Sequence, residues 1–284
     1  MVATIIDGKE LAKEMRSELK KEVEQLKEKG VTPGLAIILV GNNPASLSYI
    51  KGKQKASEEI GVSFKLEHLE ESISQEELLE VIEKYNQDDR YDGILVQLPL
   101  PDHIDETAVI EKISPEKDVD GFHPINVGRM MTGQDAFLPC TPAGIVEMIK
   151  SANIEIPGKH VVVVGRSNIV GKPVGQLLLN ENATVTYCHS KTKNLREHTI
   201  QGDILIVAVG RPHFIGADHI KEGAVVIDVG VNRLENGKLV GDVKFDEAKE
   251  KASAITPVPG GVGPMTITML VYNTVKSAKK RVRP

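Results

Sequence analysis

A tyrosine and a lysine stand four positions apart in the segment YIKGK, residues 49–53. Because residues at i and i+4 share one face of a helix, Tyr49 and Lys53 can act on one ligand. A lysine held beside a pocket can lose its proton near neutral pH and then serve as an acid or a base. The pair is also typical of an ordinary exposed helix face, and we expect Lys51 and Lys55 to be solvated.

A glutamine ends the apolar segment DGILVQ, and the turn sequence LPLP follows it. Ligands of open α/β sheets lie at the carboxyl ends of the strands, so we expect Gln97 to face a site. Its amide can hydrogen-bond a lysine amine without adding charge, which tunes the lysine instead of locking it in an ion pair. The alternative interpretation is a strand-end residue that satisfies a loop backbone.

Two carboxylates, Asp118 and Asp120, occur in the segment KDVDGF. A carboxylate there can accept two hydrogen bonds from an amino-pyrimidine, or can form an Asp-Gly turn. Further along, the segment TPVPGGVGP, residues 256–264, is too rigid and too rich in glycine for a random linker. It predicts a shaped loop where a flat ring lies against the backbone.

A phosphate site is predicted in the segment VVVVGRSNIVGKPVGQLLL, residues 161–179. Four valines read as a strand buried on both faces, and Gly165 then allows a tight turn. Gly171 and Gly175 allow close packing of the helix that follows, whose first amides form a ready phosphate site. The spacing differs from G-x-G-x-x-G, so an ordinary strand–turn–helix stays open as the alternative.

The residues after the next strand favour NADP over NAD. Folds that bind NAD place an acidic residue about 20 positions after the glycine turn, where it accepts the ribose hydroxyls. Here that strand, ATVTY, is followed by CHSKT, which contains no carboxylate. Arg166, Ser190 and Lys191 instead offer the guanidinium, hydroxyl and amine that a 2′-phosphate attracts. His189 is interpreted as a loop residue.

The elements that must position these groups alternate along the chain. In the first half, helices are predicted over 7–29, 45–60 and 74–86, and strands over 35–40, 64–69 and 93–97. In the second half, strands are predicted over 161–164, 184–187, 204–208 and 225–229. This rhythm is typical of parallel sheets covered by helices.

Two α/β domains with a cleft between them are therefore predicted, an N-terminal parallel-sheet catalytic domain and a Rossmann-like NADP-binding domain. Residues 114–142 change character, with turn residues and little periodicity, and are expected to join the two. A last helix over 266–280 is expected to return to the first domain. The predicted bounds are 1–138 plus 266–284 for the catalytic domain and 139–265 for the NADP-binding domain.

The composition is that of a soluble protein inside the cell. The 284 residues suffice for two domains, and the net charge of −5, from 35 basic and 40 acidic residues, predicts no nucleic-acid partner. Cys140 and Cys188 form neither a disulfide framework nor a metal motif, so we expect a reducing cytoplasm and no metal. No apolar stretch approaches the roughly 18–20 residues needed to cross a bilayer, and the N-terminus lacks the pattern of a signal peptide.

Taken together, the motifs closely resemble those of the bifunctional methylenetetrahydrofolate dehydrogenase/cyclohydrolase family, the FolD family. They run in order over about residues 36–275, as YIKGK, DGILVQLPLP, PEKDVDGFHPINVGRM, PCTPAGI, VVVGRSNIVGKPVG, CHSKT and TPVPGGVGPMT. The resemblance implies oxidation of 5,10-methylenetetrahydrofolate by NADP+ and hydrolysis of the methenyl product to 10-formyltetrahydrofolate. It also implies a homodimer and a place in one-carbon metabolism and purine biosynthesis.

The resemblance carries roles onto matching residues. Lys53 matches the catalytic lysine, Tyr49 the tyrosine that packs on and orients the folate, and Gln97 the glutamine that tunes the lysine. Asp120 matches the carboxylate that holds the pterin, and the loop beside the folate is matched by Pro259, Gly260 and Gly261. Arg166 and Ser190 match the positions that hold the 2′-phosphate. The full set of cofactor-binding residues expected is Gly165, Arg166, Ser167, Gly171 and Ser190.

Other functions stay open at this point. An enzyme of this fold with only one of the two activities is one alternative. A regulatory nucleotide-binding module without turnover is another, and in such a module Lys53 would be dispensable. A different NADP-linked dehydrogenase would need another acid–base group, such as a His–Asp pair.

Overall fold

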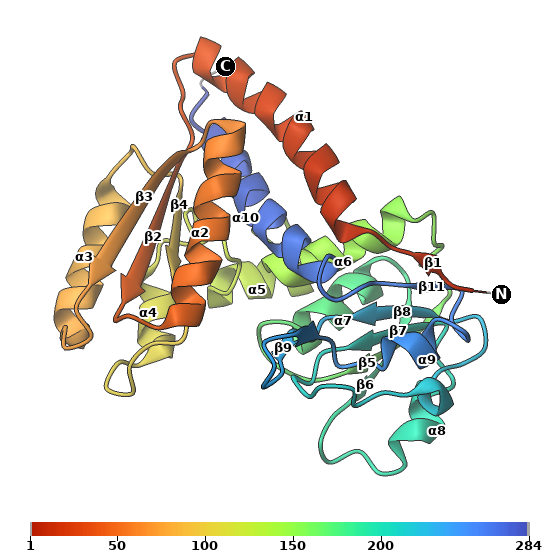
Figure 1. Ribbon diagram of the computed structural model, residues 1–284. Helices are drawn as coiled ribbons and strands as arrows, with labels where there is room; N and C mark the ends of the chain where they lie inside the picture. Colours follow the sequence, from red (N-terminus) through yellow and green to blue (C-terminus); the bar gives the residue numbers. More distant parts are fainter. Residues whose placement is uncertain (1, 283–284) are drawn as a thin grey trace. The chain divides into compact units, whose positions relative to one another are not determined.

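The computed structural model describes residues 2–282 and divides into two compact units, each built on its own parallel sheet (Figure 1). The three-strand unit comprises Lys13–Cys140 together with the residues from Ile267 onward. The six-strand unit comprises the residues up to Ala12 together with Thr141–Thr266. The predicted fold class, two α/β domains, is confirmed, and the cleft expected between them stays a prediction.

The sheet of the three-strand unit has the order β3-β2-β4. Its strands are β2 (Gly34–Val40), β3 (Ser63–Leu69) and β4 (Gly93–Val96), and both pairings are parallel. Its helices include α2 (Pro44–Ile60), α3 (Gln75–Gln87), α4 (Glu106–Lys112) and α5 (Pro124–Met131). The three strands and the helices α2 and α3 were predicted to within one or two residues, whereas α4 and α5 were not predicted.

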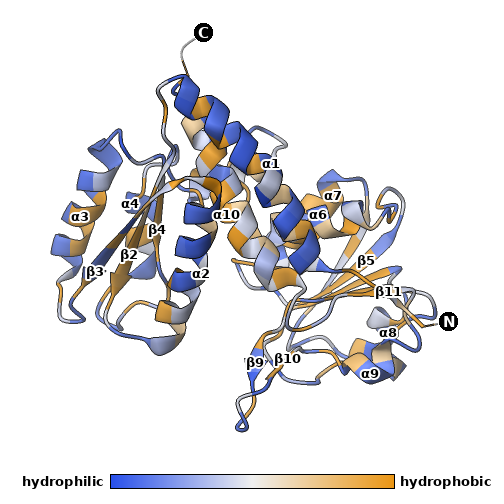
Figure 2. Cartoon of the chain, turned by 45° about the horizontal axis from the view of Figure 1, so that its top comes forward, coloured by the Kyte–Doolittle hydropathy of each residue, from blue (hydrophilic) through white to orange (hydrophobic). Residues whose placement is uncertain are grey.

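The central strand β2 is apolar and buried along its whole length, because both faces of the sheet are covered. Alternate β2 residues, among them Ala36 and Ile38, pack with Leu78 and Ile82 of α3 and with Val109 of α4. Figure 1 shows α2 on the other side of this sheet, and Figure 2 shows β2 and β4 as hydrophobic and α2 as largely hydrophilic. Helix α3 begins with the predicted capping box, in which Ser74 and Glu77 satisfy each other's backbone N–H groups.

The sheet of the six-strand unit is also entirely parallel, in the order β1-β11-β8-β7-β5-β6. Its strands are β1 (Thr4–Ile5), β5 (His160–Val164), β6 (Thr184–Cys188), β7 (Ile204–Val207), β8 (Val225–Asp228) and β11 (Ala254–Ile255). A small antiparallel hairpin consists of β9 (Asn232–Arg233) and β10 (Leu239–Val240). The helical elements are α6 (Cys140–Ser151), α7 (Gly171–Asn180), α8 (Leu195–Thr199), η1 (Ala217–His219) and α9 (Phe245–Ala248).

The N-terminal residues correct the predicted domain bounds. The prediction put residues 1–138 in the catalytic domain, but the residues up to Ala12 belong to the six-strand unit. Strand β1 pairs with β11, and the N–H of Thr4 donates to the carbonyl of Ser253 at 2.8 Å. A two-residue strand shows no periodicity that indicates which sheet it joins, so the sequence could not decide this point.

The predicted joining region is also corrected, because residues 114–140 belong to the three-strand unit and contain α5. The chain passes between the units at three places, after Ala12, Cys140 and Thr266. The first place lies inside α1 (Gly8–Glu28) and the last inside α10 (Val262–Lys279). Single helices therefore contribute residues to both units.

The predicted return of the last helix to the first domain is confirmed. Within the three-strand unit, the side-chain amide of Asn273 on α10 donates to the carbonyl of Val119 at 2.9 Å and to that of Leu138 at 3.1 Å. Just beyond the helix, the Arg281 guanidinium pairs with the buried carboxylate of Asp92. The basic C-terminal segment thus helps to fix α10 to this unit.

Candidate active site

The lysine and the glutamine singled out in the sequence meet in the three-strand unit. The Lys53 ammonium donates a 2.8 Å hydrogen bond to Oε1 of Gln97, and Nε2 of Gln97 donates to the carbonyl of Leu98 at 2.9 Å. The second bond fixes the amide, because only its nitrogen can donate to a carbonyl. Gln97 is buried at the end of β4, and its N–H donates to the carbonyl of Ile38 on β2. The strand-end position therefore directs the amide oxygen at the lysine.

Helix α2 holds both Lys53 and Tyr49. The side chain of Asn43 caps the helix by accepting from the N–H groups of Ala45 and Ser46, which fixes where the first turn begins. Tyr49 lies one turn before Lys53 and is 54% exposed, whereas Lys53 is half-buried. An exposed aromatic ring beside a half-buried amine offers a flat ligand a stacking surface next to a proton donor or acceptor.

Asp120 and Cys140 share the electrostatic environment of Lys53. Burial lowers the pKa of Lys53, and the interactions of Lys53 with Asp120 and Cys140 oppose that shift. Burial likewise raises the pKa of Asp120, and Lys53 opposes it. Burial raises the pKa of the Cys140 thiol well above its usual range. No local pattern in the segment PCTPAGI predicts Cys140 as a site residue.

The structure separates the roles of the two aspartates in KDVDGF. Asp118 is buried and accepts hydrogen bonds from the backbone of the loop that follows it and from Asn126. The shortest runs from the N–H of His123 at 2.8 Å. Asp118 therefore stabilises the turn that contains Asp120 and Gly121. Asp120, which is partly exposed and interacts with Lys53, is the carboxylate that can face a ligand.

The glycine turn after β5 has the tight backbone that the sequence predicts. Gly165 has φ +135°, and a Cβ there would lie 2.3 Å from the carbonyl oxygen of Ala208. A Cβ at Gly171, where α7 begins, would lie 2.5 Å from the carbonyl oxygen of Gly165. The Ser167 hydroxyl accepts from the N–H groups of Val170 and Gly171 at 3.1 and 3.2 Å, so its oxygen helps to close this turn.

Strand register brings Arg166 and Ser190 to the same edge of the six-stranded sheet. Val164 of β5 pairs with Cys188 of β6, and the N–H of Gly165 donates to the carbonyl of Cys188 at 2.8 Å. Arg166 and Ser190 each stand two residues beyond these partners, and both are exposed. A positive charge and a hydroxyl thus occupy neighbouring strand ends beside a helix N-terminus.

His189 is part of the loop after β6, as interpreted from the sequence. Its N–H donates to the Thr192 hydroxyl at 2.8 Å, and its Nδ1 accepts from the N–H of Lys191 at 3.2 Å. The imidazole therefore supports the backbone that carries Ser190.

The predicted folate loop is shorter than expected, because α10 already begins at Val262. Its residues Pro259, Gly260 and Gly261 belong to the six-strand unit, and the carbonyl of Gly260 accepts from the N–H of Lys9 at 3.0 Å. The other predicted folate residues, Tyr49, Lys53, Gln97 and Asp120, all belong to the three-strand unit.

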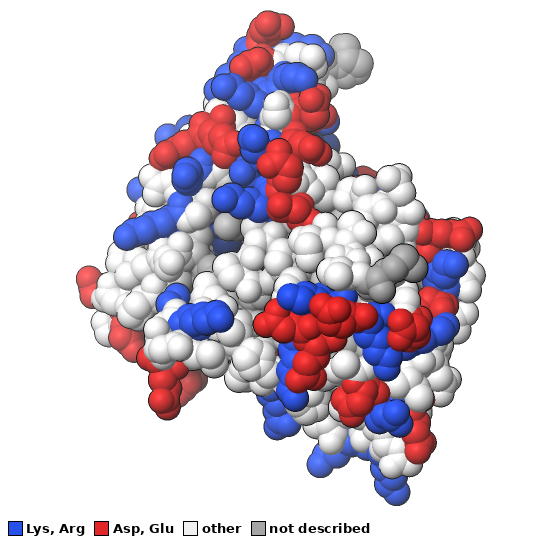
Figure 3. Space-filling view, turned by 45° about the vertical axis from the view of Figure 1, so that its right-hand side comes forward, with Lys and Arg blue, Asp and Glu red and all other residues white. Residues whose placement is uncertain are grey.

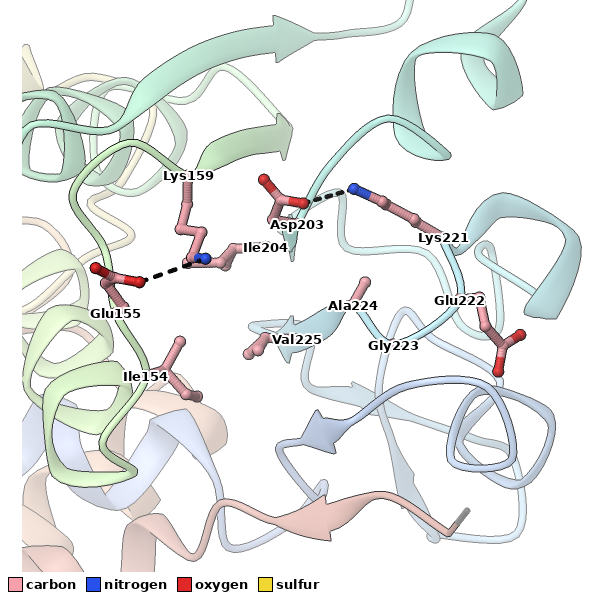
Figure 4. A pocket seen from close by; sticks show the side chains of 10 residues that line it. All are labelled: Ile154, Glu155, Lys159, Asp203, Ile204, Lys221, Glu222, Gly223, Ala224 and Val225. Atoms are coloured by element: carbon pink, nitrogen blue, oxygen red, sulfur yellow. Dashed lines mark hydrogen bonds and ion pairs between the residues drawn. The ribbon is translucent and has the colours of Figure 1, made fainter.

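A cavity of about 180 Å³ lies at the opposite edge of the six-stranded sheet from the glycine turn (Figure 4). It is lined by residues that precede or open β5, β7 and β8, and two ion pairs lie among them. The ammonium of Lys221 lies 2.6 Å from Asp203, and that of Lys159 lies 3.5 Å from Glu155. Ligands of parallel sheets bind at the carboxyl edge, so we do not assign the cofactor to this cavity.

Charged side chains of both signs lie on the surface that Figure 3 shows. On the face in Figure 3, acidic and basic side chains are interspersed. Among residues 2–282, no group of three or more histidine, cysteine or acidic side chains could hold a metal ion. No helix in this part of the chain combines the length and apolar character needed to cross a membrane.

The fold and the two sets of residues define a class of protein. The parallel sheet of the six-strand unit, with its glycine turn and its cationic residue at a strand end, is the architecture of a dinucleotide-binding enzyme. The three-strand unit supplies a lysine whose pKa is lowered by burial. Residues 6–120 match the catalytic domain of the tetrahydrofolate dehydrogenase/cyclohydrolase family. Residues 139–282 match the NAD(P)-binding domain of the same family. The chain belongs to the tetrahydrofolate dehydrogenase/cyclohydrolase family.

Similar proteins extend over the whole chain. The bifunctional protein FolD of Bacillus licheniformis is 72% identical over 283 residues, which is 100% of both chains. The crystal structure of FolD from Campylobacter jejuni is 54% identical, covers 98% of this chain and 99% of its own, and superposes with a TM-score of 0.97. The Trypanosoma brucei FolD structure, solved with NADP cofactor and inhibitor, is 41% identical, covers 100% of both chains and has a TM-score of 0.96.

Proposed function

We propose that this protein oxidises 5,10-methylenetetrahydrofolate with NADP+ to 5,10-methenyltetrahydrofolate and hydrolyses that product to 10-formyltetrahydrofolate. Family membership over the full chain supports both activities. The observation that carries the proposal is the Lys53–Gln97 hydrogen bond, because it joins a half-buried amine to an uncharged partner.

Lys53 is the acid–base group of the hydrolysis. Water attacks the methenyl carbon and must lose a proton, and one ring nitrogen must gain a proton as the ring opens. Burial lowers the pKa of Lys53, so its amine can hold or release a proton at Nζ closer to neutral pH than an exposed lysine does. Gln97 orients that nitrogen without adding a charge that would keep it protonated.

The residues that match the family's folate-binding positions offer different kinds of contact. Tyr49 offers an exposed ring for stacking, one turn from Lys53. Asp120 offers a carboxylate that can accept two hydrogen bonds from the amino-pyrimidine part of the pterin. The loop of Pro259, Gly260 and Gly261 offers backbone groups to the same substrate.

The residues after β5 and β6 fit NADP. Gly165 and Gly171 keep the turn free of side chains, and Arg166 and Ser190 hold the 2′-phosphate from neighbouring strand ends. When bound, NADP+ would supply the hydride acceptor of the oxidation. The chain's own contribution to that step is placement of the substrate carbon, and such placement can lower a barrier by up to roughly 7–11 kcal/mol.

We further propose that the protein is a homodimer in the cytoplasm and acts in the one-carbon metabolism that serves purine biosynthesis, as the family resemblance implies. Light scattering coupled to size-exclusion chromatography tests the dimer, because a single species at the mass of one chain would contradict it.

Parallel assays test the central proposal. One assay follows NADPH formation from methylenetetrahydrofolate and NADP+, and the other follows hydrolysis of added methenyltetrahydrofolate by its absorbance. Activity in both is expected. Activity in only one would indicate a monofunctional enzyme, and activity in neither would favour a non-catalytic nucleotide-binding protein.

A further inference from the structure

Two buried aspartates of the six-strand unit have no part in the proposed reaction. Asp228 ends β8 and is 4% exposed, and Asp242 follows β10 and is fully buried. Buried carboxylates are costly unless hydrogen bonds satisfy them, so their partners reveal what they organise.

Asp242 fixes the loop that follows β7. Its carboxylate accepts hydrogen bonds from three consecutive backbone N–H groups, those of Val209 at 2.7 Å, Gly210 at 2.9 Å and Arg211 at 2.8 Å. The side-chain amide of Asn232 on β9 donates a fourth, at 2.9 Å. Three successive amides can converge on one carboxylate only if the loop keeps this shape.

Asp228 fixes the position of Asp242 in turn. Its carboxylate accepts from the N–H groups of Asp242 at 3.0 Å and Val243 at 2.9 Å, and from that of Gly230 at 3.0 Å. The N–H of Asp228 donates to the Thr256 hydroxyl at 2.8 Å. The end of β8 is thereby tied to the segment that carries Asp242.

Two glycines make room for these carboxylates. A Cβ at Gly230 would lie 2.2 Å from Oδ1 of Asp242, and a Cβ at Gly241 would lie 1.8 Å from Oδ2 of Asp228. Each aspartate therefore packs against the glycine beside the other. The arrangement is sterically specific and needs these four residues together.

The loop held by Asp242 stands at the carboxyl edge of the sheet, on the far side of β5 from β6. Chain order reverses between β5 and β7, and dinucleotides bind across such a switch point. A dinucleotide whose 2′-phosphate lies at Arg166 and Ser190 places its other half over the ends of β7 and β8.

We propose that Asp242, held by Asp228, is a positioning residue that shapes the loop Val209–Arg211 to receive the nicotinamide half of the dinucleotide. The proposal rests on the NADP-dependent function proposed above. Arg166 and Ser190 bind the 2′-phosphate, whereas Asp242 acts on the binding of the nicotinamide half.

The variant Asp242→Asn tests the proposal, because an amide of the same size turns an N–H₂ group toward the loop donors. Calorimetry is expected to show about a tenfold or larger rise in the Kd for NADP+. The Kd for 2′-phosphoadenosine diphosphate ribose, which lacks nicotinamide, is expected to stay unchanged. Hydrogen exchange at Val209–Arg211 is expected to accelerate. The matched control is Asp246→Asn, whose aspartate side chain is 90% exposed.

A milder variant, Asn232→Ala, removes only one of the four hydrogen-bond donors to the Asp242 carboxylate. It provides the test if Asp242→Asn does not fold. It is expected to weaken NADP+ binding less strongly and with the same selectivity. Equal weakening of both ligands, or unchanged binding of both by a folded variant, would overturn the positioning role. If the unaltered protein bound neither ligand, the NADP assignment itself would be contradicted.

Discussion

The Nζ atom of Lys53 and the Oε1 atom of Gln97 lie 2.8 Å apart, in a pair that carries at most one charge. The other end of the amide donates to the Leu98 carbonyl, so the oxygen faces the lysine. Since the partner is neutral, burial can lower the pKa of the lysine, whereas a carboxylate at the same place would raise it. The protonation of Lys53 therefore depends on having an amide, and not a carboxylate, at position 97.

Replacing Lys53 with methionine removes the proton-transfer group and keeps most of the side-chain volume. We expect methenyl hydrolysis to fall by about 10²-fold or more, since general acid–base catalysis contributes about that much. The dehydrogenase activity should fall far less, because hydride transfer depends on placement. The exposed Lys55 on the same helix gives the matched control, Lys55→Met. Full hydrolytic turnover by a folded Lys53→Met protein would contradict the assigned role.

Replacing Gln97 with glutamate introduces a negative charge beside Lys53 at almost constant shape. The charge stabilises the ammonium and raises the pKa of Lys53, so less neutral amine exists at a given pH. If the neutral amine is the base, hydrolysis rises with pH through the pKa of Lys53. The rising limb of the pH–rate profile should therefore move to higher pH in Gln97→Glu. An unmoved limb, measured over the same pH range, would rule out control of this proton by Gln97.

Replacing Arg166 with alanine removes the guanidinium proposed to hold the 2′-phosphate. We expect the KM for NADP+ to rise by about tenfold or more, because charge-assisted bonds to phosphate are among the stronger polar interactions. The KM for NAD+, which lacks that phosphate, should change little and serves as the internal control. An equal effect on both dinucleotides would mean that Arg166 does not recognise the 2′-phosphate.

Replacing Arg281 with alanine tests how the C-terminal segment is fixed. Its guanidinium contacts both oxygens of Asp92 at 2.7 and 2.9 Å, and Asp92 is 4% exposed. Loss of the guanidinium removes the ion-pair partner of a buried carboxylate that still accepts from the N–H of Gly34, so the free energy of unfolding should fall by about 1.5–3 kcal/mol. Arg90→Ala breaks an exposed pair with Asp88 and should cost less than about 1 kcal/mol. Urea denaturation measures both, and similar values would contradict a special role for Arg281.

The sequence predicted regular elements best where local signals were strong. Helix α3 combined apolar periodicity with a capping box at Ser74 and Glu77, and both are present. The seven-residue helix α4 was missed, because about two turns give too little periodicity to distinguish a helix from a loop. The start of α10 was placed at 266 instead of Val262, because glycine and proline in its first turn resemble a loop.

The site residues, like the regular elements, could be predicted where the signal lies in the local sequence and not where it depends on residues distant in the chain. Lys53, Gln97 and Asp120 could be nominated from residue type, position at a strand end and family resemblance. Residue type alone does not distinguish Asp120 from Asp118, because the difference depends on where the N–H groups of residues 121–123 point. Asp242 was missed altogether, since its donors at Val209–Arg211 lie about 30 residues away in the chain.

The sequence by itself determined the two α/β domains, the glycine turn at Gly165 and the residue types at each strand end, because these follow from local periodicity and backbone preference. Only the tertiary structure decided that β1 joins the sheet of the six-strand unit, that Asp118 serves its own loop, and that Asp242 organises the loop Val209–Arg211. These outcomes depend on hydrogen bonds and burial between residues far apart in the chain, and no local pattern encodes those.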